Sequence, residues 1–272
     1  MKTFLLIIIT AFACSINKTV QTPVFSLPES KHSFIVIAHR GNHTRVPENT
    51  IAAFTEGINI GVDYVEVDLR TTKDSVLVVM HDATVDRMTN GKGKISELIY
   101  AEIHQLKIPG KNTAAQYDIP TFEEVLTTCK NKTHIYLDFK DASVEQTYHM
   151  IKKNGMQNQV IVYINTAFQY KEWKRVAPAI PLMVSLPGTI KNEESLRGFL
   201  EKTPVALLDG NFNGYTIAMV AAAKSAGTPV WPDIQGTDEA GNWHRALELG
   251  FRGLQTDHPE QLIAYLKKKG LR

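Results

Sequence analysis

The sequence predicts an α/β fold, and two observations favour a (β/α)8 TIM barrel with a small insertion after the second strand. From residue 34 onward, short apolar runs alternate with helix-like segments and give eight strand–helix units. Ionisable residues follow strands that are far apart in the sequence, and in a barrel the carboxyl ends of all strands meet on one rim. Periodicity alone leaves a doubly wound open sheet as the alternative.

Composition and charge narrow the class of protein. The chain has 272 residues, of which 43% are hydrophobic and 21% are charged, as expected for a globular protein with a substantial core. We expect one domain, because α/β barrels of about 250 residues fold as a single unit. The net charge of +2 gives no basic field, so we expect no nucleic-acid partner. Two cysteines, Cys14 and Cys129, do not support a disulfide framework.

Residues 1–14 have the pattern of a secretory signal peptide. A positive start at Lys2 precedes an apolar core and a small-residue end at Ala11 and Ala13. The apolar run is shorter than the ~20 residues of a membrane-spanning helix. Cys14 follows directly, as in a lipoprotein, so a lipidated, membrane-anchored protein and a soluble exported protein are both open. We predict export, periplasmic or membrane-anchored, with a tether over residues 15–33 and the barrel over residues 34–272.

Local signals place the individual elements. Strands at 34–38 and 64–69 flank a helix over 49–60, and residues 76–80 pair back onto the second strand as a hairpin. Residues 82–119 are irregular, hold one short helix and form the insertion. A helix over 121–130 starts with Thr121 as N-cap and Glu124 at the capping-box position. Further strands are expected at 134–139, 160–164, 182–186, 205–208, 229–234 and 253–256, and further helices at 144–154, 168–176, 194–201, 215–226, 243–249 and 259–269.

Two spacings in residues 34–81 carry chemistry. Glu66 and Asp68 are two positions apart on one strand, so their carboxylates face the same way, and a divalent cation such as Mg²⁺ or Ca²⁺ would offset their repulsion. A solvated strand face is the alternative. His39 and His81 lie at strand ends, where a histidine can transfer a proton near neutral pH. Taken singly, a histidine at such a position is more often structural or merely exposed.

A family resemblance joins these residues. His39-Arg40-Gly41, Pro47-Glu48-Asn49-Thr50, Glu66-Val67-Asp68 and His81-Asp82 occur in the order typical of glycerophosphodiester phosphodiesterases. The similarity continues less strictly through residues 120–124, 137–140, Trp231 and 253–257. The chain therefore resembles that family over nearly all of its length after the leader, and the resemblance also implies a (β/α)8 barrel.

The resemblance implies roles for individual residues. Glu66, Asp68 and Asp138 would hold a divalent metal ion, although the family usually has Glu at the position of Asp138 and an ion pair between Asp138 and Lys140 is the alternative. His39 and His81 would be the catalytic acid and base. The remaining expected site residues are Arg40 and Lys140 on the phosphate, Trp231 against the alcohol or in the barrel core, Glu48 near the site or at a helix dipole, and Asn42 near the site or in a turn.

The resulting hypothesis is a metal-dependent phosphodiesterase. It would hydrolyse small glycerophosphodiesters to glycerol 3-phosphate and an alcohol, with one histidine as general base and the other as general acid. A phospholipase that acts on lysolipids or intact lipids is one alternative, although the insertion is polar for a lipid-binding loop. A non-catalytic surface lipoprotein that binds phosphate esters is another, and it would be expected to have lost some of these residues.

Overall fold

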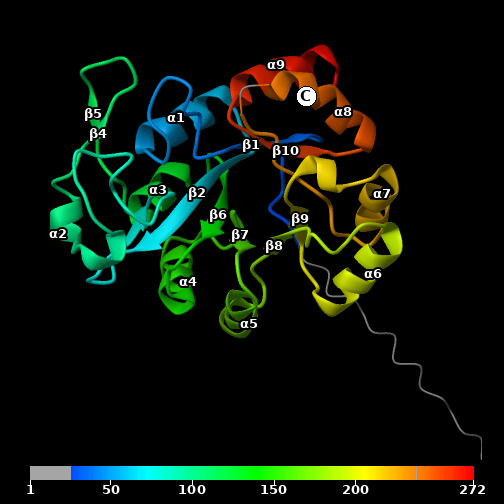
Figure 1. The fold of residues 1–272 in the computed structure, drawn as a ribbon, viewed down its shortest axis with the longest axis horizontal. Helices are drawn as coiled ribbons and strands as arrows, with labels where there is room; N and C mark the ends of the chain where they lie inside the picture. Colours follow the sequence, from blue (N-terminus) through cyan, green and yellow to red (C-terminus); the bar gives the residue numbers. More distant parts are fainter. Residues whose placement is uncertain (1–25, 237) are drawn as a thin grey trace, which may run out of the picture.

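A computed structural model describes residues 26–236 and 238–272, and within them it confirms the barrel. Seven strands form one continuous parallel sheet in the order β10-β1-β2-β6-β7-β8-β9. Figure 1 shows the sheet curled upon itself, with the helices outside it. These strands are β1 (Ile35–Ala38), β2 (Tyr64–Thr71), β6 (His134–Phe139), β7 (Val160–Ile164), β8 (Leu182–Ser185), β9 (Leu207–Asp209) and β10 (Gly253–Thr256).

The segment predicted as a strand at 229–234 closes the barrel through isolated bridges. Trp231 and Asp233 donate backbone hydrogen bonds to β9 and the residue after it, while Ile234 donates to Gln255 of β10. Pro232 has no N–H, so the segment has one donor fewer for its neighbours than an ordinary strand. The result is a strand position held on both sides without a regular ladder.

Most of the outer helices begin directly after a residue whose side chain caps the first turn. Thr50 caps α1 (Ile51–Ile60), and Thr121 with Glu124 forms the predicted capping box of α3 (Phe122–Cys129). Helix α8 (Glu239–Leu249) starts four residues before the predicted residue 243, because Glu239 is buried and accepts hydrogen bonds from Thr256 and Asp257. The other outer helices are α4 (Val144–Lys153), α5 (Ala167–Val176), α6 (Glu193–Lys202), α7 (Ile217–Ser225) and α9 (Pro259–Lys268), with a 3-10 turn, η2, at Phe212–Gly214.

Strand alternation divides the core into two layers. One face of each strand packs against the helices in a large apolar cluster that includes Val65, Val67, Leu137 and Phe139. The opposite face points into the barrel, where Ile35, Tyr64, Met183, Leu207 and Trp231 belong to a smaller apolar cluster. The inward-facing residues nearer the carboxyl ends are polar. The barrel thus has an apolar floor and a polar mouth, as its fold class predicts.

The predicted insertion has a core of its own. It follows β3 (Leu77–Val79), which pairs antiparallel with β2, and contains η1 (Ile95–Glu97), α2 (Tyr100–Ile103), β4 (Ile108–Pro109) and β5 (Gln116–Tyr117). Buried Val85, Ile95, Ile103 and Ile108 pack together with Met80. This cluster turns the apolar side chains of the insertion inward rather than toward the barrel mouth.

The chain N-terminal to β1 lies against the opposite end of the barrel. The side chains of Ser30 and His32 both contact Asp63, His32 at 2.7 Å, and Arg272 pairs with the same carboxylate. The packed part of the chain therefore extends beyond the predicted start at residue 34. The predicted signal peptide, Cys14 and residues 15–25 of the predicted tether lie outside the described residues. None of the described helices is both long and apolar enough to span a membrane.

Candidate active site

A polar pocket of about 260 Å³ lies at the carboxyl ends of the barrel strands. Strands from opposite sides of the barrel contribute to it, which confirms that the fold brings the scattered strand-end residues onto one rim. No residue in its lining is aliphatic among those the structure describes. The lining consists of His39, Arg40, Glu66, Asp68, His81, Tyr136, Asp138, Lys140, Tyr163, Asn165, Asp209, Asp233, Gln235 and Gln255.

Three of these residues form a carboxylate cluster. The parallel pairing of β2 with β6 sets Asp68 directly beside Asp138, and Glu66 lies two residues earlier on the same face of β2. One oxygen of each carboxylate lies within 4.8 Å of the other two. The Lys140 ammonium sits between Asp68, at 3.0 Å, and Asp138. Burial would lower the pKa of Lys140, but these two carboxylates hold it above its ordinary value.

The cluster fits a divalent cation. Glu66 is 2% exposed, and its burial together with the charges of Asp68 and Asp138 raises its pKa well above the usual range. Three carboxylates brought together at this depth repel each other and are incompletely neutralised by one lysine. An all-oxygen set of this kind is what hard cations such as Mg²⁺ and Ca²⁺ prefer. The residues present therefore suit such an ion.

A strained turn holds Arg40 beside this cluster. Arg40 and Asn49 both have left-handed backbone conformations, with φ of 53° and 54°, which cost roughly 1–3 kcal/mol each outside glycine. The backbone N–H of Arg40 donates to Glu66 at 2.7 Å, and the Asn49 side chain donates to Asp68 at 2.7 Å. Gly41 follows because a Cβ there would lie 2.7 Å from the backbone of Ala53. The two residues with strained backbones are therefore the ones that donate hydrogen bonds to the candidate metal ligands Glu66 and Asp68.

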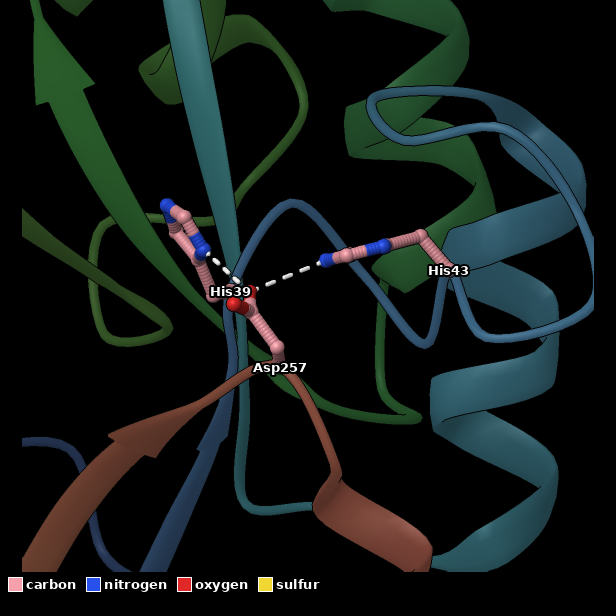
Figure 2. Close-up of side chains that lie close together, drawn as sticks. All are labelled: His39, His43 and Asp257. Carbon is pink, nitrogen blue, oxygen red and sulfur yellow. Dashed lines mark hydrogen bonds and ion pairs between the residues drawn. The ribbon is translucent and has the colours of Figure 1, made fainter. Parts of the chain in front are cut away.

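His39 is held by a carboxylate that it shares with His43. Figure 2 shows Asp257 between the two rings, which come from the loop after β1. The Oδ1 atom of Asp257 lies 2.6 Å from Nδ1 of His39 and 3.1 Å from Nε2 of His43. Burial would raise the pKa of Asp257, but these two contacts hold it well below its usual range. Because a carboxylate accepts hydrogen bonds, Nδ1 of His39 is the donor in this contact, and Nε2 points away from Asp257.

His81, which also lines the pocket, is held in the same manner. Its Nδ1 lies 2.8 Å from Asp82, and Arg87 of the insertion donates to the other oxygen of Asp82 at 2.7 Å. Hydrogen bonds from Arg87 and His81 hold the pKa of Asp82 well below its usual range. Arg87 also contacts Glu48 at 2.7 Å, and Glu48 in turn pairs with Arg40 at 2.9 Å. Glu48 is thus linked to the site through two arginines.

Three of the predicted site residues do not line the pocket: Glu48, which is linked to it through arginines, and Trp231 and Asn42. Trp231 is buried in the apolar floor of the barrel, 5.3 Å from the Tyr64 ring, and its indole occupies the space that a Cβ on Gly253 would need. This position corresponds to the barrel-core alternative. Asn42 is buried under the loop after β1, where its backbone N–H donates to Ala53. This position corresponds to the predicted alternative of a turn residue, because the contact with Ala53 holds the loop after β1 against α1.

The structure adds residues to which sequence reasoning assigned no role, although Asp233 and Asp257 were expected at strand ends on the rim of the barrel. His43 and Asp257 join His39, and Asn165 donates to Asp138 at 2.9 Å. On the opposite side of the pocket lie Asp209, which ends β9, and Gln255 of β10. Asp209 shows the sequence pattern that identified the other carboxylates, because it is an acid directly after an apolar run. The predicted strand at 205–208 ended one residue before it.

Comparison with known proteins agrees with this geometry. A curated glycerophosphodiester phosphodiesterase of Caldanaerobacter subterraneus subsp. tengcongensis is 32% identical over 246 residues, which cover 87% of this chain and 99% of the relative. The structure of an Oleispira antarctica phosphodiesterase in complex with the product sn-glycerol-3-phosphate has a TM-score of 0.76 at 23% identity, covering 86% of this chain and 96% of that one. The structure of an Agrobacterium tumefaciens glycerophosphodiester phosphodiesterase has a TM-score of 0.73 at 22% identity, with 84% and 98% covered.

The match to a family extends over most of the barrel. The model of the glycerophosphoryl diester phosphodiesterase family matches residues 39–261, from the histidine after β1 into α9. The matched region contains every residue that lines the pocket. The chain therefore belongs to the glycerophosphoryl diester phosphodiesterase family and is a phosphoric diester hydrolase.

Proposed function

We propose that this enzyme hydrolyses small glycerophosphodiesters to glycerol 3-phosphate and an alcohol, and that it needs a divalent cation to do so. One observation carries the proposal. His39 and His81 are each fixed at Nδ1 by an aspartate, and both line the pocket that also contains the carboxylate cluster, Arg40 and Lys140. Two oriented histidines around an anion-binding, metal-binding pocket are what a hydrolytic phosphodiester cleavage requires.

The charged residues have complementary roles. Glu66, Asp68 and Asp138 would hold the cation, which when bound would polarise a phosphate oxygen and offset charge that develops in the transition state. Arg40 binds the phosphate through its planar guanidinium, and Lys140 contributes a point charge. Glu48 pairs with Arg40 and fixes its orientation.

The two histidines divide the proton transfers. A water molecule attacks phosphorus directly, or a neighbouring hydroxyl of the glycerol attacks first and forms a cyclic phosphate that water then opens to glycerol 3-phosphate. In either case one histidine accepts the proton of the attacking group at Nε2. The bond between phosphorus and the leaving alcohol oxygen breaks, and the other histidine gives that oxygen a proton. Asp257 and Asp82 keep the Nδ1 proton of each ring in place, so that only Nε2 exchanges protons with the reactants.

The pocket lining favours a small polar substrate over a lipid. It contains no aliphatic residue in the described chain, and the apolar side chains of the insertion pack against each other. The Oleispira relative was solved with sn-glycerol-3-phosphate, which is the product expected here. A decayed binding protein would be expected to lack a histidine or a carboxylate, and this chain retains both histidines and all three carboxylates.

The test is a product assay on the metal-stripped protein. Release of glycerol 3-phosphate is measured from glycerophosphodiesters with choline, ethanolamine, glycerol and inositol head groups, in the presence of Mg²⁺, Ca²⁺ or EDTA. We expect release with at least one of the two cations and none in EDTA. Full activity in EDTA would remove the metal from the mechanism, and absence of release from every diester would contradict the substrate class.

Variants of the histidines assign the acid and the base. His39→Ala and His81→Ala should each lower kcat/KM for a natural diester by about 10²- to 10⁴-fold, which is the usual contribution of general acid–base catalysis. With a nitrophenyl diester, whose leaving group needs no proton, only the variant that lacks the acid should recover. If neither variant loses activity while both remain folded, the histidines have no catalytic role.

We also propose that this enzyme is exported and is either soluble in the periplasm or anchored to the membrane. The support for export is the apolar run behind Lys2 and the cysteine at position 14. Intact-mass measurement of the mature N-terminal peptide gives the answer, because an acylated Cys14 indicates a membrane-anchored lipoprotein and an unmodified cleaved end indicates a soluble exported enzyme. An uncleaved chain that starts at Met1 would argue against both.

A further inference from the structure

The side of the pocket opposite the carboxylate cluster is built from hydrogen-bond acceptors. Asp209 ends β9, Asp233 lies on the bridge-closed strand position and Gln255 lies on β10. Parallel bridges pair Asp233 with Asn211 on one side and with Gln255 on the other, so the three side chains converge on the same wall of the pocket. We refer to Asp209, Asp233 and Gln255 as the acidic wall.

Two oxygens of the acidic wall lack a partner. Tyr136 donates its hydroxyl to Oδ2 of Asp209, and the amide of Gln255 donates to Oδ1 of Asp233. Within residues 26–236 and 238–272, Oδ1 of Asp209 and Oε1 of Gln255 have no hydrogen-bond donor of suitable geometry, although these residues are only 2% and 4% exposed. Leaving a buried acceptor unpaired costs about 1–3 kcal/mol. Burial raises the pKa of Asp233 and a hydrogen bond between the Asp233 and Asp209 carboxyls offsets part of that rise, but Oε1 of Gln255 has no donor, so a ligand that supplies donors would stabilise this side of the pocket.

In the described chain the acidic wall has no lysine or arginine partner, although the charge of His39 offsets part of the effect of burial on the pKa of Asp233. The two cations that line the pocket in the described chain, Arg40 and Lys140, pair with Glu48, Asp68 and Asp138. Burial raises the pKa of both Asp209 and Asp233, and the charge of Asp233 adds to the shift at Asp209. The two carboxyls therefore resist being ionised together, and a positive charge placed against them would be stabilised.

These features select one kind of group. The acidic wall needs a ligand group that donates several hydrogen bonds, accepts none and carries a positive charge. A primary ammonium has three N–H donors and one positive charge. A quaternary ammonium has the charge without the donors, and a glycerol or inositol hydroxyl has a donor without the charge.

We propose that the acidic wall binds a primary ammonium on the alcohol portion of the diester, so that ethanolamine-type esters are the preferred substrates of this enzyme. The inference rests on the proposed function for its substrate class. In this arrangement the phosphate lies against Arg40 and Lys140, and the ammonium of the leaving alcohol lies against the acidic wall. The pocket would thus recognise a zwitterion by its two opposite charges.

The first experiment compares kcat/KM for glycerophosphoethanolamine, glycerophosphocholine and glycerophosphoglycerol. We expect the ethanolamine ester to lead by about ten- to a hundredfold, as is typical when hydrogen bonds to a charged group are gained. In Asp209→Asn, which keeps an acceptor for Tyr136 but removes the charge, this ratio should fall at least about tenfold. The matched control is Glu194→Gln, an exposed acid on α6, which should keep the wild-type ratio.

A binding measurement separates this inference from the proposed function. Calorimetry with phosphoethanolamine and phosphocholine tests recognition without turnover, and phosphoethanolamine should bind more tightly in the wild type but not in Asp209→Asn. If no diester is cleaved but this binding difference is found, the acidic wall recognises an ammonium and the hydrolytic proposal is wrong. If diesters are cleaved without preference and without dependence on Asp209, the inference is overturned. A second Ca²⁺ or Mn²⁺ per chain that is lost in Asp209→Asn, with no ester preference, would overturn it in favour of a metal site.

Discussion

Carboxylates on the two sides of the pocket are balanced differently. On the side of β1, β2 and β6, the Lys140 ammonium lies between Asp68 and Asp138, and Glu66 accepts from the backbone of Arg40. On the side of β9 and β10, Asp209 accepts from a tyrosine hydroxyl and has an oxygen without a donor. Because the same fold supplies acids at both sets of strand ends, the counter-charges decide what each side can bind.

We refer to the side formed by Arg40, Glu66, Asp68, Asp138 and Lys140 as the balanced side. It suits an anion and a cation together, since its lysine and arginine would remain beside a phosphate while a metal occupies the carboxylates. The acidic wall suits only a cation or a donor. The comparison therefore predicts the orientation of the substrate in the pocket, with the phosphate toward β2 and β6 and the alcohol toward β9. Removal of a charge from either side is the direct way to test it.

The largest effect is expected from Lys140→Met. Loss of the ammonium removes a charge from the phosphate site, and removal of one such stabilising group costs about 10²- to 10³-fold in rate. In EDTA, Asp68 would be left buried with Asn49 and the more distant Arg40 but without the ammonium at 3.0 Å, so the free energy of unfolding should fall by about 2–3 kcal/mol. Saturating Mg²⁺ should restore much of that stability, because the dication replaces the missing positive charge. Thermal unfolding with and without Mg²⁺ measures this difference.

An exposed lysine provides the control for this variant. Lys171→Met on α5 should change neither activity nor the response to Mg²⁺. An equal loss of stability for Lys140→Met in EDTA and in Mg²⁺ would mean that Lys140 contributes packing rather than charge. The two sides of the pocket would then differ less than their contacts indicate.

A smaller effect is expected from Asp257→Asn, which tests how His39 is oriented. Loss of the carboxylate that fixes Nδ1 should lower kcat/KM by about 10- to 100-fold, as is usual for groups that orient a functional histidine. The pKa of Asp257 is lowered in the folded state, so its contribution to stability is present above the unfolded pKa of about 3.9 and is lost as the pH falls through the folded value. The stability difference between wild type and Asp257→Asn should therefore narrow as the pH drops from 7 to 3. A gap that widens on acidification would contradict this linkage.

Sequence reasoning predicted the balanced side better than the acidic wall for a physical reason. His39, Arg40, Glu66, Asp68 and His81 all lie within 34–81, where short-range spacing and strand alternation relate them. The acidic wall comes from three strands more than 20 residues apart. Only the closure of the barrel through a segment with isolated bridges brings them together, and no local pattern encodes that closure.

Trp231 illustrates a second limit of local patterns. Strand alternation correctly indicates that its side chain points into the barrel, as do those of Asp233 and Asp209. It does not indicate how far along the barrel axis an inward side chain lies, whether in the polar mouth or in the apolar floor. The indole of Trp231 packs beside Gly253 and Tyr64 in the apolar floor. The succession of barrel strands and outer helices, by contrast, was predictable, because each of these strands is an apolar run with a clear end. The short strands β4 and β5 of the insertion were not predicted.

The smallest effect is expected from Arg87→Ala, which loosens the contact of the insertion with the balanced side. Arg87 contacts Asp82 and Glu48, the carboxylates behind His81 and Arg40, but it is 46% exposed. We therefore expect a loss of at most about 1 kcal/mol in the free energy of unfolding. The fall in kcat/KM should be about three- to tenfold, since His81 and Arg40 remain but are held less firmly.

Arg175 offers a matched control for this last variant. It also bridges two glutamates, Glu145 and Glu172, on the outer helices and away from the pocket. Arg175→Ala should lose a similar amount of stability with no loss of activity. If both variants lose activity in proportion to stability, Arg87 acts only through the fold. A specific loss for Arg87→Ala that is equal for ethanolamine and choline esters would show that the insertion supports the phosphate side alone, because the acidic wall has no contact with Arg87.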